Sequence, residues 1–534
     1  MQGMSVKSMV QRGLFSKITV FLSPFPHKVW TRGDFILKKK LPIFYSAILL
    51  TLVNLLLRFV GTSFQVYLSG RIGAAGIGLL QLVLSVGSMA MVAGMAGIRT
   101  ATMYMTAEEV GRKQEDRITW VLSGCGLYSF LVSSFVAGCL YCFAPYISAT
   151  WIGHPEVTDS VRLFAAFLPV NCLCGVMVGY FTGVNRIGTL AAVEVVEQCC
   201  TMVCTILLLS MWAGHSPERA CQAVVLGSGC GAALTLTSLV ILRLLERPSS
   251  SPMISIRRQL RQTAIPLAIA DNLRTGISTV ENLMVPKRLA LYEGIASPLA
   301  AFGTVCGMVF PILTFPMAIL FGLTELLIPE LARCNAAGSR KRIDYLVKRS
   351  LRIALLFGTL CSCVLLLIAE PICIKLYNST DAGQYLKWFS PLAIMLYCDA
   401  VTDAMIKGLG QQKASVRYNI CTNLMDVVLL YLLLPKYGIV GYFISFTVTH
   451  VINFFLSIRR LLKITGLSIR LSVPIRAMTG GVIAVFAATF ATSPIWRVCI
   501  GTIILFCTWV LLGIAKAEDW RWVLSLVKRK SRPA

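Results

Sequence analysis

The chain has 534 residues, of which 56% are hydrophobic and only 14% are charged, and its mean hydropathy is +0.74. A soluble domain carries about 25% charged residues, so the composition excludes an ordinary soluble protein and indicates a multi-pass membrane protein. The formal net charge of +26 does not indicate nucleic-acid binding, because the Lys and Arg residues are dispersed over many short loops. Basic residues gather in the cytoplasmic loops of membrane proteins, and we expect the excess to lie there.

Residues 1–40 hold eight Lys or Arg residues and one acid, Asp34. The apolar run that begins at Leu41 is too long for the core of a signal peptide. We therefore expect 1–40 to be a basic cytoplasmic extension that lies against the membrane, with an amphipathic segment around Leu14 to Leu22.

Apolar runs separated by charge clusters, Gly and Pro follow along the rest of the chain. Because backbone polar groups in lipid must be paired within the segment, each run predicts a transmembrane helix. The predicted fold is all-α with fourteen spans, near 41–68, 73–98, 118–142, 160–182, 189–212, 221–244, 263–285, 299–329, 350–376, 386–407, 418–434, 438–458, 474–492 and 495–515.

The distribution of basic residues orients these spans. If the N-terminus is cytoplasmic, most Lys and Arg residues fall on the inner side, and the outer loops hold only Arg71, Arg219, Lys287, Arg288, Lys436 and Arg497. This alternation follows the positive-inside rule to the end of the chain. It predicts that both termini are cytoplasmic and that the outer loops are short.

Three loop segments recur at an offset of about 225 residues. GRIGAAG from Gly70 matches EGIASPLA from Glu293, EEVGRKQEDRI from Glu108 matches ARCNAAGSRKRI from Ala332, and TGVNRIG from Thr182 matches KGLGQQK from Lys407. A parallel six-helix repeat is typical of two-lobed transporters. We expect an N-lobe at 41–245, a cytoplasmic linker at 246–262, a C-lobe at 263–462, two further spans within 463–515 and a basic cytoplasmic tail at 516–534.

Several segments resemble one family. LLLRFVGTSFQVYLSGRIGAAGIGLLQL (Leu55 to Leu82), PMAILFGLTELLIPELARCNAAGSRKRI (Pro316 to Ile343) and AIPLAIADNLRTGISTVENLMVPKRL (Ala264 to Leu289) resemble the stage V sporulation protein B-like polysaccharide transporters. That family belongs to the MOP superfamily, with the lipid II flippase MurJ and the multidrug extrusion (MATE) proteins. The family's arginine and glycines fall at Arg58, Gly61 and Gly73–Gly76, and Gln65 stands where many relatives carry a second charged residue.

The resemblance implies a flippase in a bacterial plasma membrane, acting in cell-envelope or spore-cortex assembly. Its partners would be membrane lipids and a polyprenyl-diphosphate-linked glycan or peptidoglycan precursor, turned from the inner to the outer leaflet by alternating access. We expect a monomer without cofactor or metal. Its energy would come from a gradient, the membrane potential or the substrate's own gradient, and H⁺ and Na⁺ are the candidate coupling ions. The alternatives are a cation-coupled multidrug exporter and, from another class, a membrane glycan-processing enzyme.

Three arginines are candidate substrate-binding cations, because a guanidinium grips a diphosphate bidentately. Arg58 either reaches the outer headgroups or faces a cavity between the lobes. Arg274 is near mid-depth with Asp271 three residues before it and Glu281 seven after, on a similar face. It forms either an internal salt bridge or a cavity cation. Arg99, at the inner end of the second span, either anchors that end or receives phosphate.

Acidic residues inside the spans are candidate coupling or gate groups, because buried charges in membranes are costly. They are Asp271, Glu281, Glu194, Glu197, Asp399, Asp403 and Asp426, with Glu325 and Glu330 at the turn that leaves the eighth span. The alternatives are buried hydrogen-bond networks for the former and headgroup-level acids for the latter two. The 19 cysteines lie mostly within apolar runs, where we expect helix packing. No histidine has a catalytic or metal-binding context, so no catalytic residue is predicted.

Overall fold

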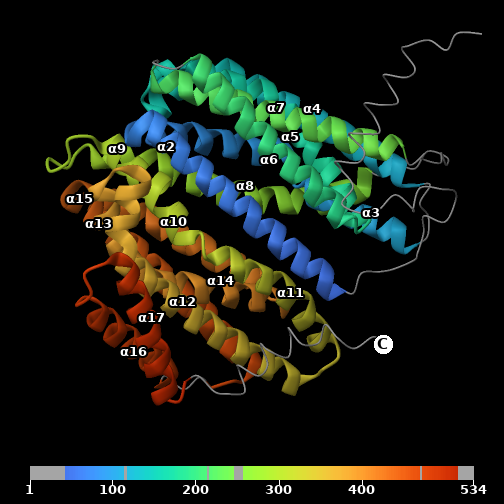
Figure 1. Ribbon diagram of the computed structural model, residues 1–534. Helices are drawn as coiled ribbons and strands as arrows, with labels where there is room; N and C mark the ends of the chain where they lie inside the picture. The colour runs from blue at the N-terminus through green and yellow to red at the C-terminus, as the bar shows by residue number, and fades with distance from the viewer. Residues whose placement is uncertain (1–42, 113–116, 213–215, 246–256, 469–471, 515–534) are drawn as a thin grey trace, which may run out of the picture.

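The computed structural model describes residues 43–112, 117–212, 216–245, 257–468 and 472–514, and every regular element in these ranges is a helix (Figure 1). The predicted all-helical fold is confirmed. The predicted N-terminal extension at 1–40, most of the predicted linker at 246–262 and the predicted tail at 516–534 lie outside the described residues.

The helices follow one another with short connections. They are α2 (Ile43–Met95), α3 (Ile98–Gly111), α4 (Ile118–Tyr146), α5 (Thr158–Gly183), α6 (Ile187–Met211), α7 (Pro217–Leu244), α8 (Arg257–Leu289), α9 (Pro298–Thr304), α10 (Phe310–Thr314), α11 (Met317–Ala336), α12 (Arg340–Tyr377), α13 (Thr380–Phe389), α14 (Ala393–Gly408), α15 (Gln412–Thr465), α16 (Ser472–Ala488) and α17 (Pro494–Leu511).

Nine helices among the described residues are long and apolar enough to cross a membrane, or up to ten if the bent pair Pro298–Thr314 and Met317–Ala336 is one span. The criterion of length and composition does not show the predicted count of fourteen spans, which stays a prediction. Two of the nine, Leu55–Gly111 and Gln412–Thr465, have 57 and 54 residues, far more than the roughly 20 that one crossing needs. The polar helix α8 is not among the nine, and α16 has only 17 residues.

Glycines interrupt both of the very long helices. Gly73 in α2 has φ 70° and ψ 178°, and Gly438 in α15 has φ 57° and ψ −135°. Side chains other than glycine rarely adopt a positive φ, so these two positions allow sharp kinks. Each long element is therefore two helices in direct succession.

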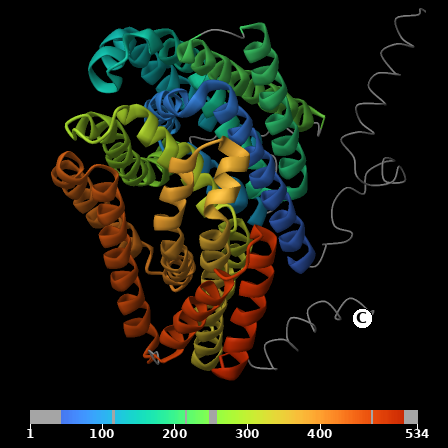
Figure 2. The same ribbon diagram turned by 60° about the vertical axis from the view of Figure 1, so that its left-hand side comes forward.

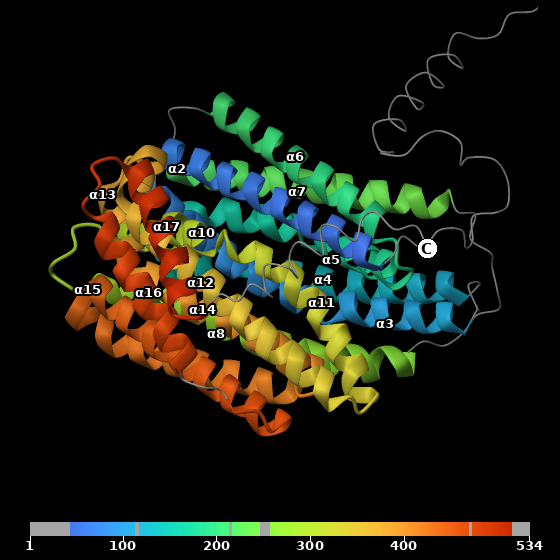
Figure 3. The ribbon, with the colours of Figure 1, turned by 60° about the horizontal axis from the view of Figure 1, so that its bottom comes forward.

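The helices form two packed groups, with α2 and α8 running between them (Figure 1). We call α2–α7 the N-terminal bundle, since α4–α7 pack on one another and on α2. We call α8–α15 the C-terminal bundle. Helices α16 and α17 pack on α12, on the side of the molecule opposite α6 and α7 (Figures 2 and 3).

Two loops at the predicted repeat offset end their helices in the same way. After α5 the Arg186 amide donates to the Phe181 carbonyl, and after α14 the Gln411 amide donates to the Ile406 carbonyl, at 2.9 and 3.0 Å. This bond is the closing contact of a Schellman motif. Asn185 and Gly410 supply the positive φ that the motif requires. The pattern supports an internal repeat, although the lobe boundaries stay a prediction.

The two bundles touch closely at one end of the molecule. A methyl group added at Gly303 in α9 would overlap the Ala74 carbonyl and lie 2.6 Å from the Gly78 nitrogen of α2. Next to this contact, Asn282 Nδ2 donates to Ser85 Oγ at 3.0 Å. We call this contact between Ala74–Gly78 and α9 the glycine seam. It closes the space between the bundles at the end where α8 finishes.

Lys287, at the end of α8, adds a polar contact across the bundles. Its Nζ donates to the Thr150 carbonyl, in the π-helical turn Ile147–Ile152 that ends α4. The last carbonyls of a helix lack intrahelical donors and favour a cation. Lys287, which stood out in the sequence as a basic residue of an outer loop, thus caps a helix of the other bundle.

Candidate functional site

A cavity of about 450 Å³ lies between the bundles, away from the glycine seam. It is lined by residues of α2, α3, α8 and α15, namely Val92, Met95, Gly97, Arg99, Thr100, Asp271, Arg274, Thr275, Ser278 and Asn423. Helices α2 and α3 belong to the N-terminal bundle, and α8 and α15 to the C-terminal bundle. A ligand in this cavity would contact both bundles at once.

A break between α2 and α3 shapes one wall of the cavity. Ala96 has φ 42° and Gly97 has φ 72°, and a positive φ at a non-glycine residue is a strained conformation. Helix α3 restarts directly after this break, and Gly97 supplies no side-chain cap. The first amides of a helix have no intrahelical acceptor and attract anions. The segment GIRT therefore brings Arg99 and the start of α3 to the same wall.

The charged side chains of the cavity are exposed to it. Arg99, Asp271 and Arg274 are all exposed. Within the ranges that the structure describes, neither Asp271 nor Arg274 has a hydrogen bond or ion pair, although their spacing of three residues permits one. Arg99 interacts electrostatically with Glu194, but among the described residues no carboxylate is close enough to form an ion pair with it. Two guanidinium groups and one carboxylate are thus open to a ligand.

Arg58 faces the C-terminal bundle. Its Nη2 donates to Thr314 Oγ1 of α10 at 2.5 Å, and the neighbouring Phe59 ring packs edge-on against Phe315, with centroids 6.4 Å apart. Arg58 does not line the 450 Å³ cavity. Two helical turns further along α2, Gln65 Nε2 donates to the Gly307 carbonyl at 3.3 Å. In this conformation Arg58 connects the first half of α2 to the other bundle.

The two acids of α6 lie inside the N-terminal bundle. Glu197 accepts a hydrogen bond from Thr235 of α7 at 2.8 Å. Glu194 is near both Arg99 and Glu197. Glu194 therefore lies near the cavity wall that carries Arg99.

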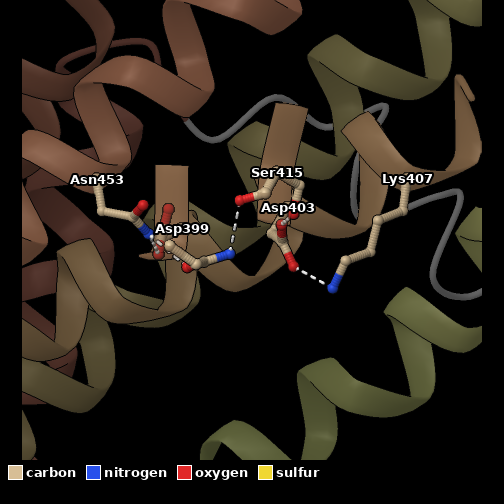
Figure 4. Close-up of polar contacts among 6 residues, drawn as sticks. Asp399, Asp403, Lys407, Ser415 and Asn453 are labelled. Atoms are coloured by element: carbon tan, nitrogen blue, oxygen red, sulfur yellow. Dashed lines mark hydrogen bonds and ion pairs between the residues drawn. The ribbon is translucent and has the colours of Figure 1, made fainter. Parts of the chain in front are cut away.

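Asp399 and Asp403 of α14 belong to a polar cluster between α14 and α15 (Figure 4). Asn453 Nδ2 donates to Asp399 Oδ2 at 2.9 Å, and Lys407 Nζ lies 2.5 Å from Asp403 Oδ2. Ser415 also donates to Asp403. The other oxygen of Asp399 is buried and has no hydrogen-bond partner among the described residues. Such an atom is costly unless something satisfies it.

A second pair of acids lies further along α15. The carboxyl groups of Glu281 in α8 and Asp426 in α15 lie close enough to interact. Ser445 Oγ and Thr449 Oγ1 donate to Asp426, at 2.5 and 3.4 Å. The two carboxyl groups therefore lie together inside the C-terminal bundle.

Glu330 binds within its own bundle. It is 2.5 Å from Arg342 of α12 and 3.8 Å from Arg333 of α11. The sequence had left open a gate residue and a headgroup-level acid at this position. Glu325 lies on α11, and its side chain is not among those that the structure describes. Among the described residues, Glu330 therefore forms no ion pair with the N-terminal bundle in this conformation, and its gate role stays a prediction.

Sequence reasoning did not single out the neutral polar residues of the cavity. Thr100, Thr275, Ser278 and Asn423 all line it, and each offers hydrogen bonds to a polar ligand. The one local signal was Gly97 beside Arg99, because a glycine after an apolar periodic run marks the end of a helix. Among the described residues no group of three or more His, Cys, Asp or Glu side chains is arranged to hold a metal ion.

Comparisons with known proteins match both the fold and parts of the sequence. The MatE family model matches residues 266–432. The stage V sporulation protein B of Bacillus subtilis (strain 168) is 21% identical over 444 residues, which cover 80% of this chain and 85% of that protein. The lipid II flippase MurJ of the same organism is 21% identical over 413 residues, covering 69% of this chain and 73% of that protein.

Solved structures share the fold. A lipid II flippase MurJ in an inward closed conformation matches with a TM-score of 0.65 and 12% identity, covering 89% of this chain and all of that chain. An inward-facing multidrug resistance MATE family transporter of the MOP superfamily matches with a TM-score of 0.63 and 15% identity, covering 78% of this chain and all of that one.

The candidate spans indicate a multi-pass membrane protein, and its fold is shared with solved MATE and MurJ structures. The chain belongs to the MOP superfamily, as the sequence predicted. Within that superfamily it is similar to stage V sporulation protein B over most of its length.

Proposed function

We propose that the protein is a flippase that moves a polyprenyl-diphosphate-linked glycan, an oligosaccharide or a peptidoglycan precursor, from the inner to the outer leaflet. The observation that carries this proposal is the cavity between the bundles, where Arg99 and Arg274 are open to a ligand beside the uncapped start of α3. The similarity to a lipid II flippase supports the same substrate class.

A diphosphate fits the donors of this cavity. Each guanidinium presents a planar fork of N–H donors that matches two phosphate oxygens, and a helix N-terminus adds backbone N–H groups. Arg99 and Arg274 come from different bundles, so a bound diphosphate bridges them. Thr100, Thr275, Ser278 and Asn423 would accept and donate hydrogen bonds to the attached sugar.

The proposed transport cycle is alternating access between the bundles. The glycine seam closes one end, while the cavity lies toward the other, where α8 begins. By the distribution of basic residues we assign the α8 start to the cytoplasm and the seam to the outer face. Fourteen spans, both termini in the cytoplasm and a bacterial plasma membrane complete this proposal.

The coupling ion, H⁺ or Na⁺, would act through the acids of the C-terminal bundle. The unsatisfied oxygen of Asp399 offers a ligand to a cation, and the carboxyl pair of Glu281 and Asp426 offers a proton site. Glu281 belongs to α8, and Asp399 lies on α14, which packs on α15, a direct neighbour of α8. Binding there would therefore change the packing of the helix that carries Arg274.

A cation-coupled multidrug exporter is the second candidate function. The match of the MatE family model to 266–432 and the exposed carboxylate of Asp271 in the cavity favour it. A cationic drug would meet two guanidinium groups in the same space, however, and like charges repel. The two candidate functions differ in the ligand that binds the cavity, which is a diphosphate for the flippase and an organic cation for the exporter.

The test uses the full chain in proteoliposomes that contain a fluorescent polyprenyl-diphosphate sugar as the probe. Translocation of the probe is measured by its accessibility to a membrane-impermeant reagent. We expect wild-type protein to translocate the probe. Arg99→Gln and Arg274→Gln should each reduce the rate at least tenfold, because a charge-assisted hydrogen bond to phosphate contributes about 1.5–3 kcal/mol. Arg417→Gln, an exposed arginine of α15 outside the cavity, is the matched control and should retain the wild-type rate.

Two outcomes oppose the proposal. If both cavity variants translocate the diphosphate probe like wild type, the diphosphate does not bind at this cavity. If a lipophilic cation is transported by wild type and the diphosphate probe is not, the exporter function replaces the flippase function.

A further inference from the structure

Asp271 is an anion in a cavity that otherwise attracts anions. It lines the same space as Arg99 and Arg274 and is exposed to it. A carboxylate at this position repels a diphosphate and so opposes its binding. Its presence is therefore unfavourable for a ligand that carries only negative charge.

Asp271 is also unpaired in this conformation. Arg274 lies three residues further along α8, at the spacing that places side chains on one face, yet the structure holds no ion pair between them in the described part of the chain. Both charges remain directed to the ligand space rather than neutralising each other. A ligand that bears charges of both signs would satisfy both.

Neutral hydrogen-bonding groups are already available for sugar hydroxyls. Thr100, Thr275, Ser278 and Asn423 line the cavity, and hydroxyl and amide groups both donate and accept. A carboxylate only accepts hydrogen bonds, and its bond is strongest when the donor carries a positive charge. The group that matches Asp271 best is therefore an ammonium.

We propose that the transported head group carries a free ammonium group that donates to Asp271 while its diphosphate is held by Arg274 and Arg99. This inference rests on the proposed flippase function and narrows its substrate class to glycans with an amino sugar or an amine-bearing substituent. Because Asp271 and Arg274 are neighbours on one face of α8, the ammonium lies within a few ångströms of the diphosphate.

The test compares two short-chain probes on the full chain in detergent, farnesyl-diphosphate glucosamine and farnesyl-diphosphate N-acetylglucosamine, which differ in the ammonium group. We expect wild type to bind the amine probe about tenfold more tightly, as a charge-assisted hydrogen bond allows. Asp271→Asn, which keeps the shape and removes the charge, should abolish this preference. Raising the pH until the amine is neutral should abolish it in wild type, which separates charge from the bulk of the acetyl group.

Arg274→Gln separates this inference from the function on which it rests. It should weaken both probes together and leave their ratio unchanged. If it weakens both, but wild type does not distinguish the probes or Asp271→Asn keeps the preference, the ammonium proposal is overturned and the flippase proposal stands. If neither Arg274→Gln nor Arg99→Gln weakens either probe, the flippase proposal itself fails.

Discussion

Single side chains in this protein differ in role according to the direction in which the fold turns them. Arg58 was expected to reach either the outer headgroups or a cavity between the lobes, and its guanidinium instead donates to Thr314 of the other bundle. Arg274, for which an internal salt bridge and a cavity cation were both open, lines the cavity without a described ion-pair partner. The two arginines should therefore respond differently to substitution.

For Arg58→Ala we expect a loss of transport without a loss of binding. The substitution removes a charge-assisted hydrogen bond between the bundles that contributes about 1.5–3 kcal/mol, so the transport rate should fall at least tenfold while the dissociation constant for a soluble diphosphate probe stays within about twofold. Thr314→Val, which removes the acceptor and keeps the shape, should reproduce the effect. A loss of probe affinity equal to that of Arg274→Gln would show that Arg58 binds the diphosphate directly.

Three helices, α2, α8 and α9, determine how the two bundles meet. The glycine seam brings the backbones of α2 and α9 into direct contact, because Gly303 has no side chain to separate them. The break at Ala96–Gly97 begins α3 at the cavity wall. Helix α8 carries Asp271 and Arg274 to the cavity and Glu281 to the buried carboxyl pair.

Gly303→Ala should open the glycine seam. The added methyl would overlap the Ala74 carbonyl, and such overpacking costs about 1–3 kcal/mol. We expect faster amide hydrogen exchange in α9 and the adjoining part of α2, together with slower transport. Gly61→Ala, where an added methyl meets nothing within 4 Å, is the matched control. Equal exchange in the two variants would contradict a tight seam.

Asp399→Asn should uncouple transport from the ion gradient. The variant keeps the hydrogen-bonding shape near Asn453 but removes the charge that a coupling cation or proton would neutralise. We expect the response of the transport rate to an imposed H⁺ or Na⁺ gradient to disappear, with unchanged binding of the diphosphate probe. Asp381→Asn, an exposed acid at the start of α13, should keep the response. A full response in Asp399→Asn would assign coupling to other groups.

At the scale of the whole molecule, the two bundles meet through a seam at one end and enclose a cavity away from it. Ser85 of α2 and Asn282 of α8 are joined across the bundles by a hydrogen bond of 3.0 Å. The proposed alternating-access cycle requires this contact to break in each turnover.

A cross-link between positions 85 and 282 should therefore stop transport. We expect a short bifunctional thiol reagent to inhibit the double variant Ser85→Cys/Asn282→Cys and a reductant to restore its rate. Each single variant is a control, and the wild type is treated in parallel because the chain has 19 native cysteines. Unimpaired transport by the cross-linked protein would exclude movement between these helices.

The sequence by itself determined that the protein is an all-helical, multi-pass membrane protein. Hydropathy is a local property, so a run of apolar residues predicts a buried helix wherever it occurs, and the all-helical multi-pass prediction was confirmed. Loop motifs such as TGVNRIG and KGLGQQK could also be matched in one dimension, and the loops after α5 and α14 share their hydrogen-bond pattern.

Only the tertiary structure decided which charges meet. Arg58 and Thr314 are 256 residues apart, and Arg99 and Arg274 reach one cavity from different bundles. The carboxyl pair of Glu281 and Asp426 likewise joins two helices. Sequence spacing relates side chains within one helix, but the rotation of each helix against its neighbours depends on packing with distant segments. That rotation places Asp271 and Arg274 in the cavity and turns Arg58 toward the other bundle.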